Sequence, residues 1–276
     1  MRIDLSGKTA LVTASTAGIG FAIADGLAES GARILLNGRS ASSVERAVGE
    51  LRSRHPSASI QGIAADLATA EGATRLIQGA PRADILVNNV GIFEPRPFFD
   101  TTDTDWERHF QTNVMSGVRL SRHYLREMLA RDWGRIVFIS SESALNIPPD
   151  MIHYGMTKTA QLAIARGLAK LAAGTAVTVN AVLPGPTLSQ GVRDMLAGMD
   201  SRGSGIRGEP RSGGEPRSLE ESGADFVRAH RSSSILQRMA KPEEVANLVV
   251  YVCSPQASAT TGAALRVDGG VVDSIV

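Results

Sequence analysis

Tyr154 and Lys158 are the residues whose types and spacing point most directly to chemistry. They are four positions apart within a helix expected over residues 152–172, so both side chains share one helix face. An ammonium beside a phenol favours the phenolate, and we expect Lys158 to lower the pKa of Tyr154 from about 10 toward the working pH of a general acid or base. The same spacing is common in ordinary surface pairs, so the pair alone does not establish a catalytic site.

Ser141 directly follows a strand expected over residues 135–140. The carboxyl ends of parallel strands form the edge of the sheet at which ligands bind. A hydroxyl there can hydrogen-bond the substrate oxygen that Tyr154 would serve, although a serine after a strand also caps or turns the chain.

Asn113 lies in a helix expected over residues 104–131, on an apolar stripe of three- and four-residue spacing. The other members of this stripe are Trp106, Phe110, Gly117 and Leu120. A buried amide needs hydrogen-bond partners. Asn113 therefore either holds a water molecule or bonds a neighbouring backbone group.

The elements that must position these residues are short strands alternating with longer helices. Apolar runs typical of strands buried on both faces are expected over residues 9–13, 33–37, 60–65, 85–88, 135–140, 176–183 and 264–267. Helices are expected over residues 18–30, 42–54, 73–78, 104–131, 152–172 and 242–253. This pattern predicts an α/β fold, a single Rossmann-type domain over residues 1–276, with a doubly wound parallel sheet of about seven strands and helices on both faces.

The turn at residues 13–20, TASTAGIG, ends the first strand and opens the first helix. Small residues at such a turn let backbone N–H groups approach a pyrophosphate at the helix N-terminus, where the dipole also favours an anion. A tight turn that needs glycine only for its backbone conformation would look similar. Glycine patterns at residues 7–9 and 203–208 are discarded because neither follows a strand.

Composition and charge exclude several classes of protein. The chain of 276 residues has a formal net charge of +1, which argues against a nucleic acid or a membrane surface bound through a basic patch. The single cysteine, Cys253, excludes an intramolecular disulfide framework and is typical of a reducing compartment. No apolar run approaches the roughly 20 residues of a membrane helix, and we read no signal peptide, so a cytoplasmic protein with no bound metal is expected.

Residues 201–218 interrupt the alternation because they are rich in Gly, Ser, Arg and Pro. Such a composition cannot bury a core face and predicts a loop. We expect a substrate-loop insertion at about residues 188–230, with residues 188–218 ordering over the substrate; a plain surface insertion is the alternative. The pocket walls are expected after Thr187 and from residues 143–153, which include Leu145, Ile147, Pro148, Pro149 and Met151.

Together these residues resemble the short-chain dehydrogenase/reductase family, and the chain is similar to 3-oxoacyl carrier-protein reductases over essentially its whole length. The family's glycine motif, T-G-x-x-x-G-x-G, resembles residues 13–20, with Ala14 in place of the first glycine. Its N-N-A-G, P-G and V-D-G-G motifs resemble residues 88–91, 184–185 and 267–270.

The resemblance implies hydride transfer between a nicotinamide and a carbonyl or alcohol carbon. Tyr154 would donate the proton, Ser141 would hydrogen-bond the substrate oxygen, Lys158 would hold the nicotinamide ribose, and Asn113 would position a relay water. The cofactor-binding residues that it implies are Ala14, Ser15, Thr16, Gly18, Ile19, Gly20, Arg39, Ser40, Asp66, Leu67, Asn88, Val90, Gly91, Tyr154, Lys158, Pro184, Gly185 and Thr187. A homotetramer, built through the helices at residues 104–131 and 152–172, is also implied.

The end of the second strand favours NADP over NAD. NAD-specific relatives carry a carboxylate there, which hydrogen-bonds the adenine ribose and repels a 2′-phosphate. Here Gly38 leaves room, Arg39 can bind the phosphate with a planar fork of donors, and Ser40 can add a hydroxyl. Arg39 could instead be a solvated residue that opens the next helix, and Ala17 stands where the family often has a second basic residue, so NAD remains possible.

These observations lead to an expected function. We expect an NADP-dependent ketoreductase for a small-molecule substrate, either a 3-oxoacyl compound or another aliphatic ketone. An NAD-dependent alcohol or sugar dehydrogenase is the first alternative, because substrate choice lies in loops. A non-catalytic dinucleotide-binding sensor is the second, and the complete set of catalytic residues argues against it.

Overall fold

The computed structural model describes residues 2–193 and 218–275. The described residues form one sheet of parallel strands in the order β3-β2-β1-β4-β5-β6-β7. The strands are β1 (Thr9–Val12), β2 (Arg33–Gly38), β3 (Ile60–Ala64), β4 (Ile85–Asn88), β5 (Gly134–Ile139), β6 (Val177–Pro184) and β7 (Ala264–Val267). The central strands β4, β5 and β6 are buried along their whole length, which explains their mostly apolar sequences.

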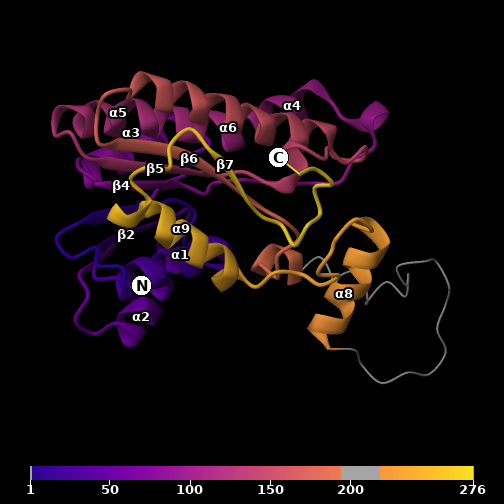
Figure 1. Ribbon diagram of the computed structural model, residues 1–276, viewed down its shortest axis with the longest axis horizontal. Helices are drawn as coiled ribbons and strands as arrows, with labels where there is room; N and C mark the ends of the chain where they lie inside the picture. The colour runs from indigo at the N-terminus through magenta and orange to yellow at the C-terminus, as the bar shows by residue number, and fades with distance from the viewer. Residues whose placement is uncertain (1, 194–217, 276) are drawn as a thin grey trace.

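Helices cover both faces of the sheet (Figure 1). One face carries α1 (Gly18–Glu29), α2 (Ala41–Arg54) and α9 (Pro242–Cys253), whose side chains share a core with that face of the strands. The other carries α3 (Ala70–Gly79), α5 (Ser116–Ala130) and α6 (Ile152–Leu171), which build a second core. The expected doubly wound Rossmann-type sheet is therefore confirmed. None of the described helices has an apolar stretch long enough to cross a bilayer.

The helix expected over residues 104–131 is interrupted. It begins as α4 (Asp103–His109), continues as a π-helical turn over Phe110–Met115, and ends as α5. A π-helical turn accommodates one extra residue without breaking the run of helical residues, so the hydrophobic pattern did not reveal it. Such turns often occur at functional sites, and this one holds Asn113.

A helix, α8 (Leu219–His230), lies within the stretch that the sequence predicted as a loop insertion. Ser218 and Glu221 form a capping box: Ser218 Oγ accepts from the Glu221 amide at 3.3 Å, and the Glu221 carboxylate accepts from the Ser218 amide at 2.9 Å. The loop expectation was wrong for this part. Helix α8 lies beyond the segment 188–218 that we expected to order over the substrate, and residues 194–217 of that segment lie outside the described residues.

Candidate active site

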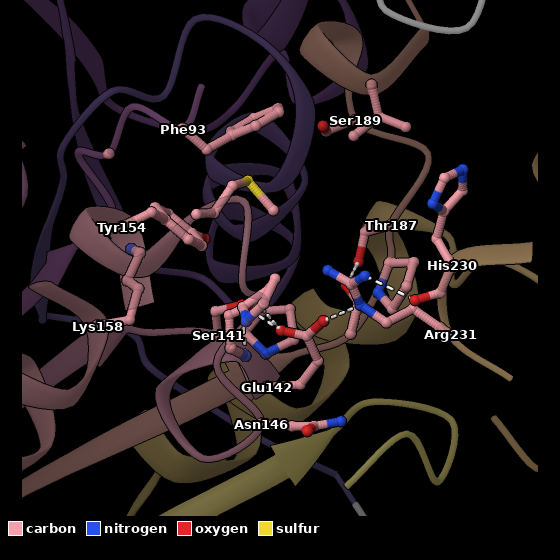
Figure 2. Close-up of a pocket in the computed structure, with 18 of the residues that line it drawn as sticks. Phe93, Ser141, Glu142, Asn146, Tyr154, Lys158, Thr187, Ser189, His230 and Arg231 are labelled. Atoms are coloured by element: carbon pink, nitrogen blue, oxygen red, sulfur yellow. Dashed lines mark hydrogen bonds and ion pairs between the residues drawn. The ribbon is translucent and has the colours of Figure 1, made fainter. Parts of the chain in front are cut away.

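A cavity of about 720 Å³ opens beyond the carboxyl ends of β4, β5 and β6 (Figure 2). Ser141, Tyr154 and Lys158 line it together, as the sequence predicted. Five predicted cofactor-binding residues outside this group also line it: Ile19, Gly91, Pro184, Gly185 and Thr187. The parallel sheet therefore brings residues from four separate segments to one edge.

Tyr154 and Lys158 lie one turn apart on α6, and Lys158 Nζ is 5.6 Å from the centre of the Tyr154 ring. Lys158 is buried; its Nζ donates to the Ile139 carbonyl at 2.9 Å and to Gln161 Oε1 at 3.4 Å. Burial lowers the pKa of Lys158 to about 7, because a charged ammonium is poorly solvated there.

The predicted lowering of the Tyr154 pKa is not what the structure shows. Its desolvated position raises the pKa of Tyr154 to about 12, and this outweighs the opposing effect of a hydrogen bond with Ser141. The phenol is therefore fully protonated at neutral pH in the free protein. That form suits a proton donor, which is the role expected in carbonyl reduction.

Ser141 ends the β5 segment and is nearly buried. Its Oγ donates to Glu142 Oε2 at 2.7 Å and accepts from the Ser143 amide at 3.1 Å. The Ser140 hydroxyl, next to it, donates to the Lys158 carbonyl at 2.9 Å and so ties β5 to α6. These contacts fix the serine against the helix that carries Tyr154.

Asn113 is buried in the π-helical turn and holds the start of the β4–α4 connection. Its amide donates to the Ile92 carbonyl at 3.0 Å and accepts from the Ile92 amide at 2.8 Å. It also donates to Thr157 Oγ1 on α6. The Asn113 side chain therefore hydrogen-bonds a neighbouring backbone group, which is the second of the two predicted alternatives.

Gln161 is a site residue that sequence reasoning missed. Its Nε2 donates to the backbone carbonyl of Asn113 at 2.6 Å, while its Oε1 accepts from Lys158 Nζ. The side chain therefore bridges the two residues between which the resemblance implied a water. Its position one turn beyond Lys158 on α6 was the available signal, but a glutamine there has no recognisable pattern.

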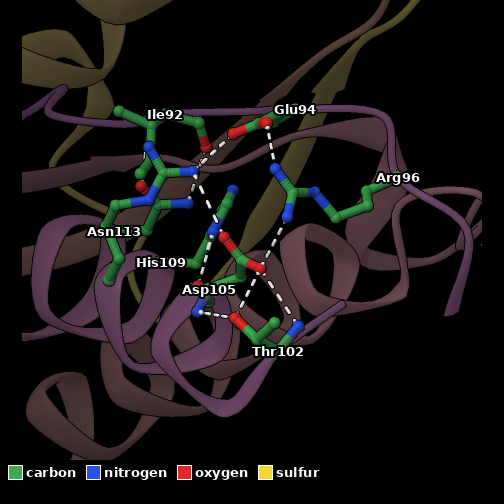
Figure 3. Close-up of polar contacts among 8 residues, drawn as sticks. Ile92, Glu94, Arg96, Thr102, Asp105, His109 and Asn113 are labelled. Carbon is green, nitrogen blue, oxygen red and sulfur yellow. Dashed lines mark hydrogen bonds and ion pairs between the residues drawn. The ribbon is translucent and has the colours of Figure 1, made fainter. Parts of the chain in front are cut away.

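The segment that follows β4 is fixed by an ionic network (Figure 3). Arg96 pairs with Glu94 at 2.8 Å and with Asp105 at 2.9 Å, and Arg108 also pairs with Glu94. Asp105 in turn caps α4 together with Thr102. Each exposed ion pair contributes little stability by itself. Several pairs that share carboxylates form a network, however, and this network orders the segment after β4. The segment carries Phe93, whose ring packs edge-on against Tyr154 at 6.2 Å.

The turn before α1 has the features that a pyrophosphate needs. Ala14 has a φ of 48° and Gly18 a φ of 57°, so the chain turns through left-handed conformations. A Cβ on Gly20 would come within 2.5 Å of the Ala14 carbonyl and of Asn89 Nδ2, so only glycine fits. No side chain caps α1 and no acidic residue lies in its first turn, which leaves the N-terminal amides for an anion.

The end of β2 is closely packed, so the room that the sequence predicted at Gly38 is absent. A Cβ on Gly38 would come within 2.5 Å of Thr16 Cγ2, so the two segments touch here. Arg39 is exposed and makes no hydrogen bond or ion pair with any described residue. Ser40 is the N-cap of α2, where its Oγ accepts from the Ser43 amide at 3.3 Å.

Three other predicted cofactor-binding residues, Asp66, Leu67 and Asn88, lie in different surroundings. Asp66 is exposed, and its carboxylate accepts from the Ala68 amide at 3.1 Å, while Leu67 is buried in the core. Asn88 does not reach the cavity: its amide donates to Ser121 Oγ of α5 at 3.1 Å. The next residue, Asn89, lines the cavity instead and donates to the Ala14 carbonyl.

The remaining predicted cofactor residues hold the edges of the site. Thr13 Oγ1 accepts from the Val90 amide at 3.2 Å, and Ser15 Oγ donates to the Val12 carbonyl at 2.7 Å. A Cβ on Gly185 would lie 2.5 Å from the Asp268 carbonyl, so the P-G and V-D-G-G segments are in close contact. The small residues at this edge are therefore required by backbone packing.

The substrate wall is more polar than expected. Ile147, Pro148, Pro149 and Met151 line the cavity as predicted, whereas Leu145 is not among the lining residues and is 49% exposed. Polar side chains that the sequence analysis did not single out share the wall: Glu142, Asn146, Asp150, His230 and Arg231. Among the described residues, no three His, Cys, Asp or Glu side chains are grouped to hold a metal ion.

The residues present fit a dinucleotide. The open N-terminus of α1 offers an anion site, the crowded Gly20 a close backbone approach, and Arg39 a cation that pairs with no other described residue. Ile19 of the same turn lines the cavity together with Lys158 and Tyr154.

Comparisons with known proteins agree with this geometry. The sequence profile described as short chain dehydrogenase matches residues 8–199, and one described as enoyl-(acyl carrier protein) reductase matches residues 217–272. An uncharacterised oxidoreductase of Bacillus subtilis is 48% identical over 275 residues, covering 100% of both chains. A 3-oxoacyl-[acyl-carrier-protein] reductase of Aquifex aeolicus is 31% identical, covering 98% of this chain and 100% of its own.

A solved structure supports the same relationship. L-sorbose reductase from Gluconobacter frateurii, in complex with NADPH and L-sorbose, superposes with a TM-score of 0.87. It is 29% identical, and 100% of each chain is covered.

Proposed function

We propose that this chain is an NADP-dependent ketoreductase. It belongs to the short-chain dehydrogenase family and is an oxidoreductase acting on CH–OH and C=O groups. The observation that carries the proposal is the meeting of Ser141, Tyr154 and Lys158 in one cavity, which Ile19 of the uncapped α1 N-terminus also lines. NADPH supplies the hydride when it is bound.

The protein's own groups then handle the oxygen of the substrate. Tyr154, protonated at neutral pH, donates its proton to the carbonyl oxygen as charge develops there. Ser141 donates a hydrogen bond to the same oxygen and stabilises that charge. Lys158 holds the ribose next to the nicotinamide, and Gln161 keeps the Lys158 side chain aligned through the Asn113 carbonyl.

Cofactor preference rests on the end of β2. Arg39 is exposed and pairs with no other described residue, so a 2′-phosphate can approach the guanidinium. No carboxylate stands there to repel the phosphate. The NADPH named for the sorbose reductase complex is in line with this proposal.

A polyhydroxylated ketone is a second candidate substrate beside a 3-oxoacyl or other aliphatic ketone. The specific observation in its favour is the polar part of the wall, where Asn146, Asp150 and His230 face the cavity. Such groups match hydroxyls better than they match an acyl chain. The similarity to L-sorbose reductase points the same way.

We also propose a homotetramer and a cytoplasmic location. A largely apolar groove of about 490 Å³ on the outer face of α5 and α6 supports the first; Leu125, Leu129, Ile164 and Leu168 line it. The single, buried Cys253 supports the second.

A substrate screen tests the proposal. Purified protein is incubated with 3-oxoacyl thioesters, simple aliphatic ketones and keto-sugars, each with NADPH and with NADH, and consumption of the reduced cofactor is followed. Consumption of NADPH at a higher kcat/KM than NADH is expected. Failure of every carbonyl with both cofactors would contradict the reductase, and a preference for NADH would contradict the cofactor assignment.

A further inference from the structure

Glu142 is a buried carboxylate directly beside the catalytic serine. Only 3% of the residue is exposed, although it lines the cavity. Its Oε2 accepts hydrogen bonds from the Ser141 and Ser143 hydroxyls, and its Oε1 accepts from Arg231 Nε at 2.7 Å. A buried charge requires such partners, and here two of the three donors, Ser141 and Ser143, come from the segment that follows β5.

In the hydrogen bond between Ser141 and Glu142, the serine is the donor. Glu142 Oε2 also accepts from the Ser143 hydroxyl, and the Ser141 hydroxyl donates to this same oxygen. Because Ser141 also accepts from the Ser143 amide, its only proton is committed to Glu142 in the free protein. To stabilise a developing alkoxide, Ser141 has to turn that proton from Glu142 to the substrate oxygen.

Arg231 brings a second element to the same carboxylate. It directly follows α8, 89 positions from Glu142, and its side chain is 16% exposed. Its Nη1 donates to the His230 carbonyl, which fixes the guanidinium at the end of the helix. Figure 2 shows the guanidinium reaching Glu142 from the side of the cavity opposite Tyr154.

The body of α8 is held to the rest of the protein by a small cluster. Leu188, Val227 and Met239 form it, separate from the two cores of the sheet. In Figure 1 α8 lies at one end of the molecule, away from the two helical layers. The buried contact at Arg231 is therefore a substantial part of what fastens this helix over the cavity.

We propose that the Glu142–Arg231 pair is a clasp that couples the position of α8 to the state of the Ser141 hydroxyl, with Glu142 as a positioning residue. Arg231 shares the charge of Glu142, which weakens the hold of the carboxylate on the Ser141 proton. With the clasp closed, Ser141 can donate to the substrate; with Arg231 withdrawn, Glu142 retains the proton. The catalytic part of this inference rests on the proposed reductase function.

The clasp makes an unusual prediction for paired substitutions. Arg231→Met leaves Glu142 with only its two serine donors, so kcat is expected to fall by about ten- to a hundredfold, the value of one charge-assisted hydrogen bond. Glu142→Gln removes the charge that holds Ser141, so kcat stays near wild type while KM rises as α8 loosens. In the double variant the kcat defect of Arg231→Met is expected to be largely relieved.

Two further variants separate the clasp from general damage. Arg231→Lys keeps the positive charge but places it in a less suitable geometry. Its kcat should therefore lie between that of Arg231→Met and that of wild type. Arg228→Met removes an arginine from α8 that is half exposed and pairs only with Asp225 in the described part of the chain, so kcat and KM should stay unchanged. NADPH binding and thermal unfolding are measured for every variant, to confirm that each remains folded.

Hydrogen exchange tests the mechanical half of the clasp without any substrate. Amides of α8 in Arg231→Met and in Glu142→Gln should exchange faster than in wild type and in Arg228→Met, and the double variant should add nothing further. If wild type reduces no carbonyl, the proposed function fails while this measurement still decides whether the clasp exists. Unchanged exchange in both single variants, or a double variant with kcat as low as Arg231→Met, would overturn the proposal.

Discussion

The two sides of the cavity are built by different means. The predicted cofactor side, which lines the cavity through Ile19, Asn89 and Gly91 and continues into the turn at residues 13–20, is shaped by backbone atoms and small residues that must approach one another closely. The substrate side, formed by residues 141–154 and 226–231, is shaped by side chains from segments far apart in the chain. On the cofactor side, substitutions in the tightly packed turn would disrupt the turn itself. On the substrate side, single side chains can be exchanged to change the chemistry of the wall.

This difference separates binding from chemistry. The amides and the cation of the cofactor side suit a ligand common to many reactions. In the proposed reaction, the hydroxyls, carboxylate and guanidinium of the substrate side would act on the carbonyl compound and its oxygen. Substitutions on the two sides should therefore have separable effects.

The largest effect is expected for Tyr154→Phe. The change removes the transferable proton and leaves the ring in contact with Phe93, so kcat should fall by about a thousandfold while the affinity for NADPH is kept. Steady-state rates and titration of NADPH fluorescence measure the two quantities. Turnover close to wild type would show that the proton comes from another group.

Arg39→Ala tests the cofactor side alone. Losing a charge-assisted hydrogen bond to the 2′-phosphate should raise KM for NADPH by about ten- to a hundredfold and leave KM for NADH unchanged. Arg46→Ala, which removes an exposed arginine from α2, the helix that begins two residues after Arg39, is the matched control. An equal loss with both cofactors would show that Arg39 does not bind the phosphate.

The buried Lys158 should make stability depend on pH. Its pKa falls from 10.5 in the unfolded chain to about 7 in the folded protein, so the unfolded chain binds more protons between these values. The free energy of unfolding therefore rises with pH through this window, by about 2 kcal/mol between pH 7 and 9. Urea unfolding of wild type and Lys158→Met, without cofactor, should show that the substitution removes this rise. Parallel pH profiles for the two proteins would contradict the burial of the ammonium.

The smallest expected effect concerns Ala14 in the glycine turn. Its φ of 48° is costly for a residue with a Cβ, so Ala14→Gly should stabilise the protein by up to about 1 kcal/mol. Asp132→Gly is an instructive comparison, because Asp132 also has a positive φ but its carboxylate accepts from the Ala176 amide at 2.8 Å. That substitution should destabilise the protein. Destabilisation by Ala14→Gly would show that the methyl group makes contacts that outweigh the strain.

The fold and the cofactor side were largely predictable because both leave local marks in the sequence. Buried parallel strands such as Arg33–Gly38 read as short apolar runs, and close backbone approach demands glycine at positions such as Gly20. The π-helical turn left no such mark, because the apolar stripe continues through it. The capping box at Ser218 was readable, but the composition of the preceding residues favoured a loop.

The substrate side could not be predicted for a different reason. The Glu142–Arg231 pair and the bridge made by Gln161 depend on which side chains meet in three dimensions, and neither follows a spacing rule. The pKa of Tyr154 was mispredicted on the same ground. The four-residue spacing reveals that Lys158 is a neighbour of Tyr154. The desolvation of Tyr154, in contrast, depends on every group packed around the pocket.

In the proposed reaction, a hydride passes from NADPH to a carbonyl carbon in this cavity while Tyr154 protonates the oxygen. Reduction of an accepted ketone with NADPH deuterated at the transferable position of the nicotinamide tests it most directly. The account predicts that deuterium appears on the carbinol carbon of the product with wild type and that Tyr154→Phe forms almost none of this product. A product without deuterium, or the same yield of deuterated alcohol from Tyr154→Phe, would contradict it.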